Sequence, residues 1–167
     1  MTHLKRNTPE TMVRNVIFGV EDSLVSTVGL LSGVATAGVE KNTIILAGVI
    51  LIFVEAFSMA AGAMLSENSV EEFETHREIP LRYSIAGAVA MFASYFVSGF
   101  VPLLPYLLWP ADKAFSASII ASMVGLAVLG ALSGRLFKVS LAHTALKMVI
   151  IGGLAVTIGV VAGLLLQ

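Results

Sequence analysis

The chain has 167 residues, of which 57% are apolar and only 13% are charged, with a formal net charge of −1 and no cysteine. A soluble domain carries about 25% charged residues, and a domain of this size leaves too much surface exposed to hide so many apolar side chains from water. Disorder is excluded, and lipid is the expected solvent for most of the chain. The near-neutral charge gives no support for nucleic-acid binding. Without cysteine, disulfides and thiolate metal sites are excluded.

Long uncharged runs predict an all-α integral membrane protein, with one transmembrane domain over residues 1–167. A helix needs about 20 residues to cross a bilayer. Runs of roughly that length, one of them interrupted only by Glu55, predict five helices. Their expected bounds are about 13–38, 43–66, 81–104, 113–138 and 141–167. Prolines at 102, 105 and 110 are predicted to break the third helix at its far end.

The basic residues predict the orientation of these helices, because cytosolic segments of membrane proteins are enriched in lysine and arginine. With the N-terminus in the cytosol, only Lys41 and Lys113 fall outside. The cytosolic side then holds Lys5, Arg6, Arg14, Arg77, Arg82, Arg135, Lys138 and Lys147. We therefore expect the N-terminus in the cytosol and the C-terminus outside.

Three carboxylates, Glu21, Asp22 and Glu55, fall within the predicted spans. Charges at membrane depth are costly and usually mark ion pathways, although Glu21 and Asp22 could instead be solvated near the interface. At about 1.5 Å of rise per residue, Asp22 and Met59 are expected at the same depth on antiparallel neighbouring helices. Glu55 and Met59 are four residues apart and share a helix face.

This mixture of oxygen and sulfur ligands has a chemical meaning. Carboxylates suit hard divalent ions, and a thioether adds a soft donor, so together they favour a late first-row ion such as Fe²⁺. Met59 also suits a role as a core filler, and that alternative stays open. An odd number of helices cannot be a simple duplication, so we expect a two-fold homodimer in which each ligand occurs twice.

A short acidic helical loop is predicted on the cytosolic side over residues 67–80. Its carboxylates fall on one helix face, and they are Glu67, Glu71, Glu74 and Glu78. They are interpreted either as a funnel that gathers cations at the entrance or as a solvated extension of the second helix.

Pairs of glycines four residues apart occur in the first and fifth predicted helices, at Gly29 and Gly33 and at Gly159 and Gly163. Small residues at this spacing let two membrane helices approach closely. We therefore expect both pairs to be packing devices.

Three motifs resemble the vacuolar iron transporter family and its nodulin-like relatives. They read FGVEDSLVSTVGLLSGVA at 18–35, FSMAAGAMLSENS at 57–69 and VSGFVPLLPY at 97–106. The resemblance implies a five-helix homodimer that exports Fe²⁺, sometimes Mn²⁺, from the cytosol in exchange for protons, through a pathway at the dimer interface. It also implies metal-path roles for Asp22 and Met59. No prosthetic group and no enzymatic activity are expected, since no histidine lies deep in a span.

The chain also departs from that family. It has Glu21-Asp22-Ser23 where the family often has Asn-Asp-Gly, and Ala63 where the family often has Glu, a loss for which Glu55 is expected to compensate. The loop between helices two and three is too short for the cytosolic metal-binding domain of plant-type members. A prokaryotic plasma membrane fits the short loop, with a vacuolar membrane as the eukaryotic alternative. A passive cation channel, or a proton-coupled transporter of another cation, remains the alternative function.

Overall fold

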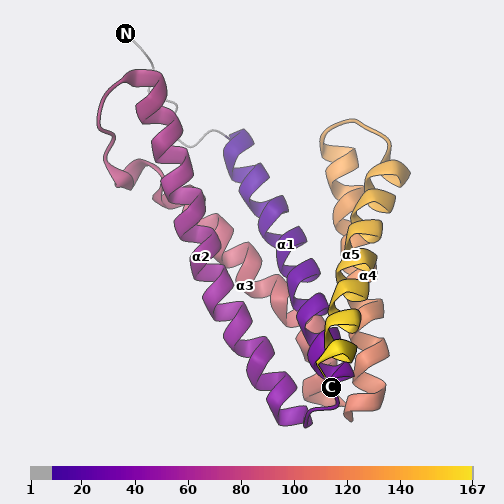
Figure 1. The fold of residues 1–167 in the computed structure, drawn as a ribbon. Helices are drawn as coiled ribbons and strands as arrows, with labels where there is room; N and C mark the ends of the chain where they lie inside the picture. The colour runs from indigo at the N-terminus through magenta and orange to yellow at the C-terminus, as the bar shows by residue number, and fades with distance from the viewer. Residues whose placement is uncertain (1–8, 167) are drawn as a thin grey trace.

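The computed structural model describes residues 9–166 as a bundle of long antiparallel helices (Figure 1). In chain order they are α1 (Pro9–Thr36), α2 (Lys41–Thr75), the short 3₁₀ helix η1 (Leu81–Tyr83), α3 (Ile85–Leu108), α4 (Ala111–Leu136) and α5 (Leu141–Leu165). Within 9–166, five of these helices are long and apolar enough to cross a membrane, which confirms the predicted fold class. Three residues used in the predictions lie outside the described part of the chain. They are Lys5 and Arg6, predicted on the cytosolic side, and Gln167, the predicted end of the fifth helix.

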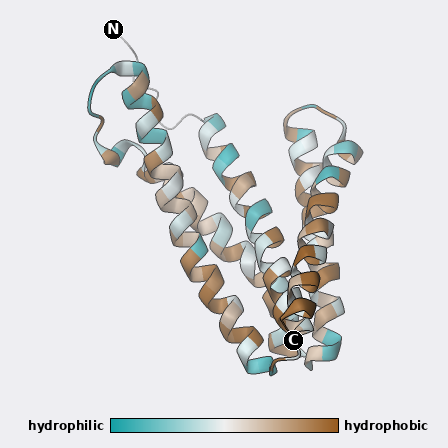
Figure 2. Ribbon diagram, viewed as in Figure 1, coloured by the Kyte–Doolittle hydropathy of each residue, from teal (hydrophilic) through white to brown (hydrophobic). Residues whose placement is uncertain are grey.

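The outer surface of the bundle is strongly apolar. Figure 2 shows hydrophobic residues along much of the length of α2, α4 and α5, with hydrophilic residues gathered toward the helix ends. Phe57 is 70% exposed, Ile158 69% and Leu132 59%. Contiguous apolar surface of this extent marks contact with lipid or with another protein, and helices satisfy their backbone hydrogen bonds inside lipid. The chain is therefore an integral membrane protein.

The first helix lies at the centre of the bundle. α1 packs against each of the other long helices, while α2 packs mainly on α3 and α4 on α5. Its side chains Leu24, Val28 and Leu31 are almost completely buried. One end of the bundle carries the start of α1, the end of α2 and the α4–α5 connection (Figure 1). We call this the loop end.

The two predicted glycine pairs pack against each other, within one protomer. A Cβ added to Gly33 on α1 would lie 2.7 Å from the carbonyl oxygen of Gly159 on α5. A Cβ on Gly163 would in turn collide with the carbonyl oxygen of Gly33. The expectation that these glycines are packing devices is confirmed, and they bring the backbones of α1 and α5 into direct contact.

Several helix boundaries differ from the predicted ones, among them the ends of α2 and α3. The prediction that Pro102 and Pro105 end the third helix was wrong, because α3 continues through both to Leu108. Each proline removes one N–H from the helix, but both prolines lie on a buried face of α3, where Tyr106 has no exposed surface. Tertiary packing therefore outweighs the local cost, and the helix stops only before Pro110. At the loop end, α2 runs without interruption through the predicted acidic loop as far as Thr75.

Candidate functional site

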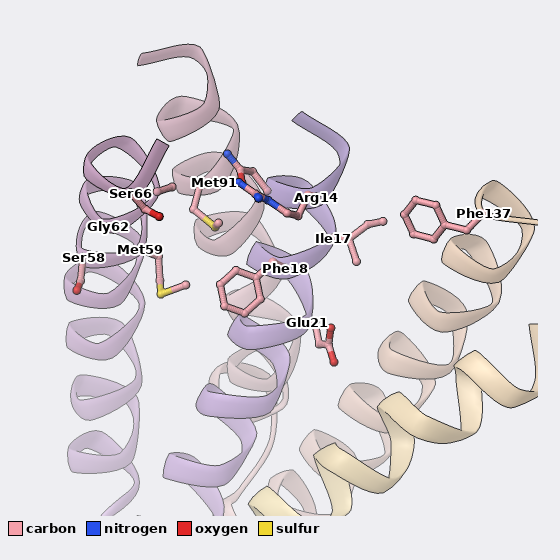
Figure 3. A pocket seen from close by; sticks show the side chains of 12 residues that line it. Arg14, Ile17, Phe18, Glu21, Ser58, Met59, Gly62, Ser66, Met91 and Phe137 are labelled. Carbon is pink, nitrogen blue, oxygen red and sulfur yellow. The ribbon is translucent and has the colours of Figure 1, made fainter. Parts of the chain in front are cut away.

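A cavity of about 780 Å³ lies between α1 and α2 in the half of the bundle near the loop end. We call it the α1–α2 cavity (Figure 3). On the α2 side its wall has helical spacing, with Met59, Gly62, Ala63 and Ser66 on one face. A Cβ added to Gly62 would have nothing within 4 Å, so its missing side chain leaves open space in the cavity.

Two of the predicted site residues, Glu21 and Met59, line this cavity. Figure 3 shows the Met59 thioether pointing from α2 toward α1, with the Phe18 ring next to it and Glu21 on the side of α1 away from α2. Both side chains are half-buried. The cavity therefore offers a soft sulfur ligand and a carboxylate on different walls.

The other two predicted site residues, Asp22 and Glu55, do not line the cavity but lie within electrostatic range of each other. Asp22 on α1 lies close enough to Glu55 on α2 for the two carboxylates to repel each other. The hydroxyl groups of Tyr95 and Ser26 are 2.6 Å apart, and that of Tyr95 also lies within electrostatic range of both carboxylates. This second polar cluster joins α1, α2 and α3 inside the membrane-spanning part of the bundle.

The expected partnership of Asp22 with Met59 is not tested by a direct contact and stays a prediction. Met59 shares the cavity with Glu21, and Asp22 is paired with Glu55. Among residues 9–166, no three or more histidine, aspartate or glutamate side chains gather closely enough to bind a metal ion.

The four predicted entrance carboxylates are divided between two places. Glu67, Glu71 and Glu74 line a hollow of about 210 Å³ at the loop end, which we call the acidic hollow. Glu78 lies beyond the end of α2, beside Glu72 and His76. The chain turns between these groups because His76 takes a left-handed conformation, with φ of 52°. The interpretation of this segment as an extension of α2 is confirmed for residues 67–75.

Sequence reasoning missed two polar residues. Asn15 is 2% exposed and hydrogen-bonds Glu67 and the carbonyl of Gly87. Tyr95 is completely buried beside the Asp22–Glu55 pair. A lone polar side chain inside an apolar helix is itself a signal of function or of interhelical bonding, so both could have been noticed.

Comparison with known proteins identifies the family. The model of the VIT family matches residues 13–82 and 79–164 of this chain. The chain belongs to the VIT family. The two matched segments meet at the connection between α2 and α3, and together they cover nearly all of the described helices.

Relatives of this VIT-family chain occur among plant proteins. Vacuolar iron transporter 1 of Tulipa gesneriana is 25% identical, over 90% of this chain and 85% of that protein. Vacuolar iron transporter 1 of Arabidopsis thaliana is 22% identical, over 90% of this chain and 84% of that protein. Vacuolar iron transporter 2 of Oryza sativa subsp. japonica is 24% identical, over 90% of this chain and 86% of that protein. The first alignment spans 211 positions, more than the 167 residues of this chain, so the relative carries segments without a counterpart in it.

Proposed function

We propose that this VIT-family chain exports divalent iron from the cytosol by proton antiport, with Mn²⁺ as a second cargo. The observation that supports this most directly is the placement of four candidate ligands on α1 and α2 inside the membrane-spanning bundle. Glu21 and Met59 line the α1–α2 cavity, and Asp22 and Glu55 form a carboxylate pair next to it. The names of the plant relatives support iron as the cargo.

Each of these ligands has a distinct chemical role. The carboxylates of Asp22 and Glu55 supply the negative charge that a divalent cation needs in place of its water shell. The thioether of Met59 favours Fe²⁺ over harder ions. Glu21 provides a carboxylate on the route that leads to them.

A homodimer completes this arrangement. The described part of one protomer holds no cluster of three acidic or histidine ligands, and a two-fold axis beside α1 and α2 would present each ligand twice. The glycine pairs of α1 and α5 are already used within the protomer. The partner is therefore expected against α1 and the Glu55 side of α2, where Ile50 and Val54 are exposed beside Glu55.

The loop end is assigned to the cytosol by its lysine and arginine residues. Six basic residues of the described chain lie there: Arg14, Arg77, Arg82, Arg135, Lys138 and Lys147. Lys41 and Lys113 lie at the other end. The α1–α2 cavity then takes metal from the cytosol and the C-terminus lies outside, in a prokaryotic plasma membrane or, in a eukaryote, a vacuolar one.

Proton coupling follows from competition at the carboxylates. A metal ion binds the deprotonated form, so binding releases protons, and an acidic compartment on the far side discharges the metal. In inverted vesicles with an acidic lumen, Fe²⁺ uptake should rise well above that measured without a pH gradient. It should return to the lower rate when an ionophore collapses the gradient.

Uptake that ignores the imposed gradient at a fixed membrane potential would favour a passive cation channel. Gradient-driven uptake of Co²⁺ or Zn²⁺ with no uptake of Fe²⁺ or Mn²⁺ would favour a transporter of another cation. Both outcomes would contradict the proposed exporter.

The thioether is expected to set the preference between the two cargo ions. Met59→Leu keeps an apolar side chain of similar volume but removes the soft donor. Fe²⁺ uptake should fall about tenfold, the equivalent of roughly 1.4 kcal/mol of lost binding. Mn²⁺ uptake should fall less, because Mn²⁺ prefers oxygen ligands. The measurement is uptake of both ions by the same vesicles.

Met64→Leu is the matched control for this change. Met64 lies on the same helix and is half-buried, but it does not line the α1–α2 cavity. Equal losses of Fe²⁺ and Mn²⁺ uptake in Met59→Leu, or equal effects of the two substitutions, would contradict the role of the sulfur.

A further inference from the structure

The acidic hollow and the α1–α2 cavity share a wall. Arg14 and Ser66 line both spaces. Asn15 lines the cavity and Glu67 lines the hollow, and the Nδ2 atom of Asn15 donates a 2.7 Å hydrogen bond to Oε1 of Glu67. Polar side chains therefore lie between the two spaces at this point.

Side chains and backbone from α1, α2 and α3 hold this wall in place. Asn15 on α1 is 2% exposed and also donates to the carbonyl oxygen of Gly87 on α3, at 3.2 Å. The side chain of Glu67 on α2 is only 13% exposed. A Cβ on Gly87 would lie 2.7 Å from Oε2 of Glu67, so the carboxylate occupies space that only glycine leaves free. The position of Glu67 is thus set by its surroundings.

The guanidinium of Arg14 is held much less firmly. Its Nη2 atom lies 3.9 Å from Oε1 of Glu67, and its side chain is 69% exposed. An exposed ion pair of this kind contributes little free energy, so Arg14 can leave Glu67 at low cost. While it stays, it places a positive charge on the boundary between two spaces that otherwise attract cations.

We propose that Arg14, Asn15 and Glu67 form a charge-controlled gate between the acidic hollow and the α1–α2 cavity. Glu67 and Asn15 are the positioning residues, and Arg14 is the charge that a passing cation must displace. The identity of that cation rests on the proposed function, but the gate itself does not. The gate makes the rate at which an ion enters the cavity depend on the sign of the charge of that ion.

The chain offers a direct way to measure this passage. It has no cysteine, so one introduced thiol reports alone. Gly62 lines the α1–α2 cavity and has nothing within 4 Å of an added Cβ. Gly62→Cys therefore places a thiol in the cavity without a clash. Its reaction with a positively and a negatively charged methanethiosulfonate of similar size is measured from the loop-end face of reconstituted vesicles.

The two charged members of the gate should change these rates in opposite directions. In the Gly62→Cys background, Arg14→Gln should speed the positive reagent about tenfold, the lower end of the effect that charge lining a cleft has on association rates. Glu67→Gln keeps an acceptor for Asn15 but leaves Arg14 unpaired. It should therefore slow the positive reagent and speed the negative one.

The control is Arg77→Gln, which removes an exposed arginine that lies outside both spaces, beside Glu72 and Glu78. It should leave the ratio of the two rates unchanged. A loosened fold would raise both rates together, whereas the gate changes their ratio. An unchanged ratio in Arg14→Gln and Glu67→Gln would overturn the proposal. Because labelling needs no metal, failure of metal transport and failure of the gate are separate outcomes.

Discussion

Asp22→Asn is expected to lower Fe²⁺ uptake by about a hundredfold. Asp22 is half-buried in the membrane-spanning part of α1 and lies within electrostatic range of Glu55 on α2. Removing one charged partner from a buried site costs roughly 2–5 kcal/mol, and each 1.4 kcal/mol corresponds to about tenfold in affinity. The measurement is the initial rate of Fe²⁺ uptake into inverted vesicles at a fixed pH gradient.

The same substitution should not weaken the fold. Asp22 and Glu55 repel each other in the absence of a cation, and neutralising one of two like charges removes that repulsion. The variant should therefore unfold at the same temperature as the wild type in detergent, or at a higher one. Loss of transport with an intact fold is the combination that identifies a ligand.

Asp112→Asn is the matched control, because Asp112 is an exposed aspartate in the first turn of α4, away from both polar clusters. The Asp112→Asn variant should take up Fe²⁺ at the rate of the wild type. If Asp22→Asn transports Fe²⁺ at the rate of Asp112→Asn, the cation does not meet Asp22, and the proposed pathway through α1 and α2 is wrong.

Gly159→Ala is expected to destabilise the protein strongly, although it adds only one methyl group. A Cβ at this position would collide with the carbonyl oxygen of Gly29, which is backbone and cannot rotate away. Overpacking of a close-packed contact costs about 1–3 kcal/mol. The free energy of unfolding of the purified variant, measured in mixed detergent micelles, should be lower than that of the wild type by at least about this amount.

Gly153→Ala provides the comparison on the same helix, since nothing lies within 4 Å of a Cβ at Gly153. It should leave stability unchanged or raise it slightly, because alanine favours the helix over glycine. Equal stability of the two variants would show that α1 and α5 do not approach closely in the membrane.

Much of the fold could be predicted from hydropathy and charge alone. Uncharged runs indicated the spanning helices because lipid tolerates few charges, and this rule does not depend on the details of packing. The errors came from local rules that packing overrides. Pro102 and Pro105 remain inside α3 because they lie on its buried face. The interpretation of residues 67–75 as an extension of α2 was correct, because charge ends a membrane span but does not end a helix.

The candidate site could be predicted as a set of residues but not as a set of neighbours. Burial cost pointed to Asp22 and Glu55, and ligand chemistry pointed to Met59. Their pairing depends on how α1 crosses α2, which no spacing within one helix contains. For the same reason Asn15 was missed, because its importance comes from Glu67 on α2, 52 residues further along the chain.

The contact between α1 and α5 has a consequence for biogenesis. Among the described helices α1 is made first, yet its Gly29 and Gly33 meet their partners on α5, the last to be made. Domains generally begin to fold while synthesis continues, but the contact between α1 and α5 can form only after α5 has been made. A nascent chain stalled before residue 141 would lack α5, and its Gly29 and Gly33 would have no helix packed against them. Such a chain is expected to be recognised as incompletely folded.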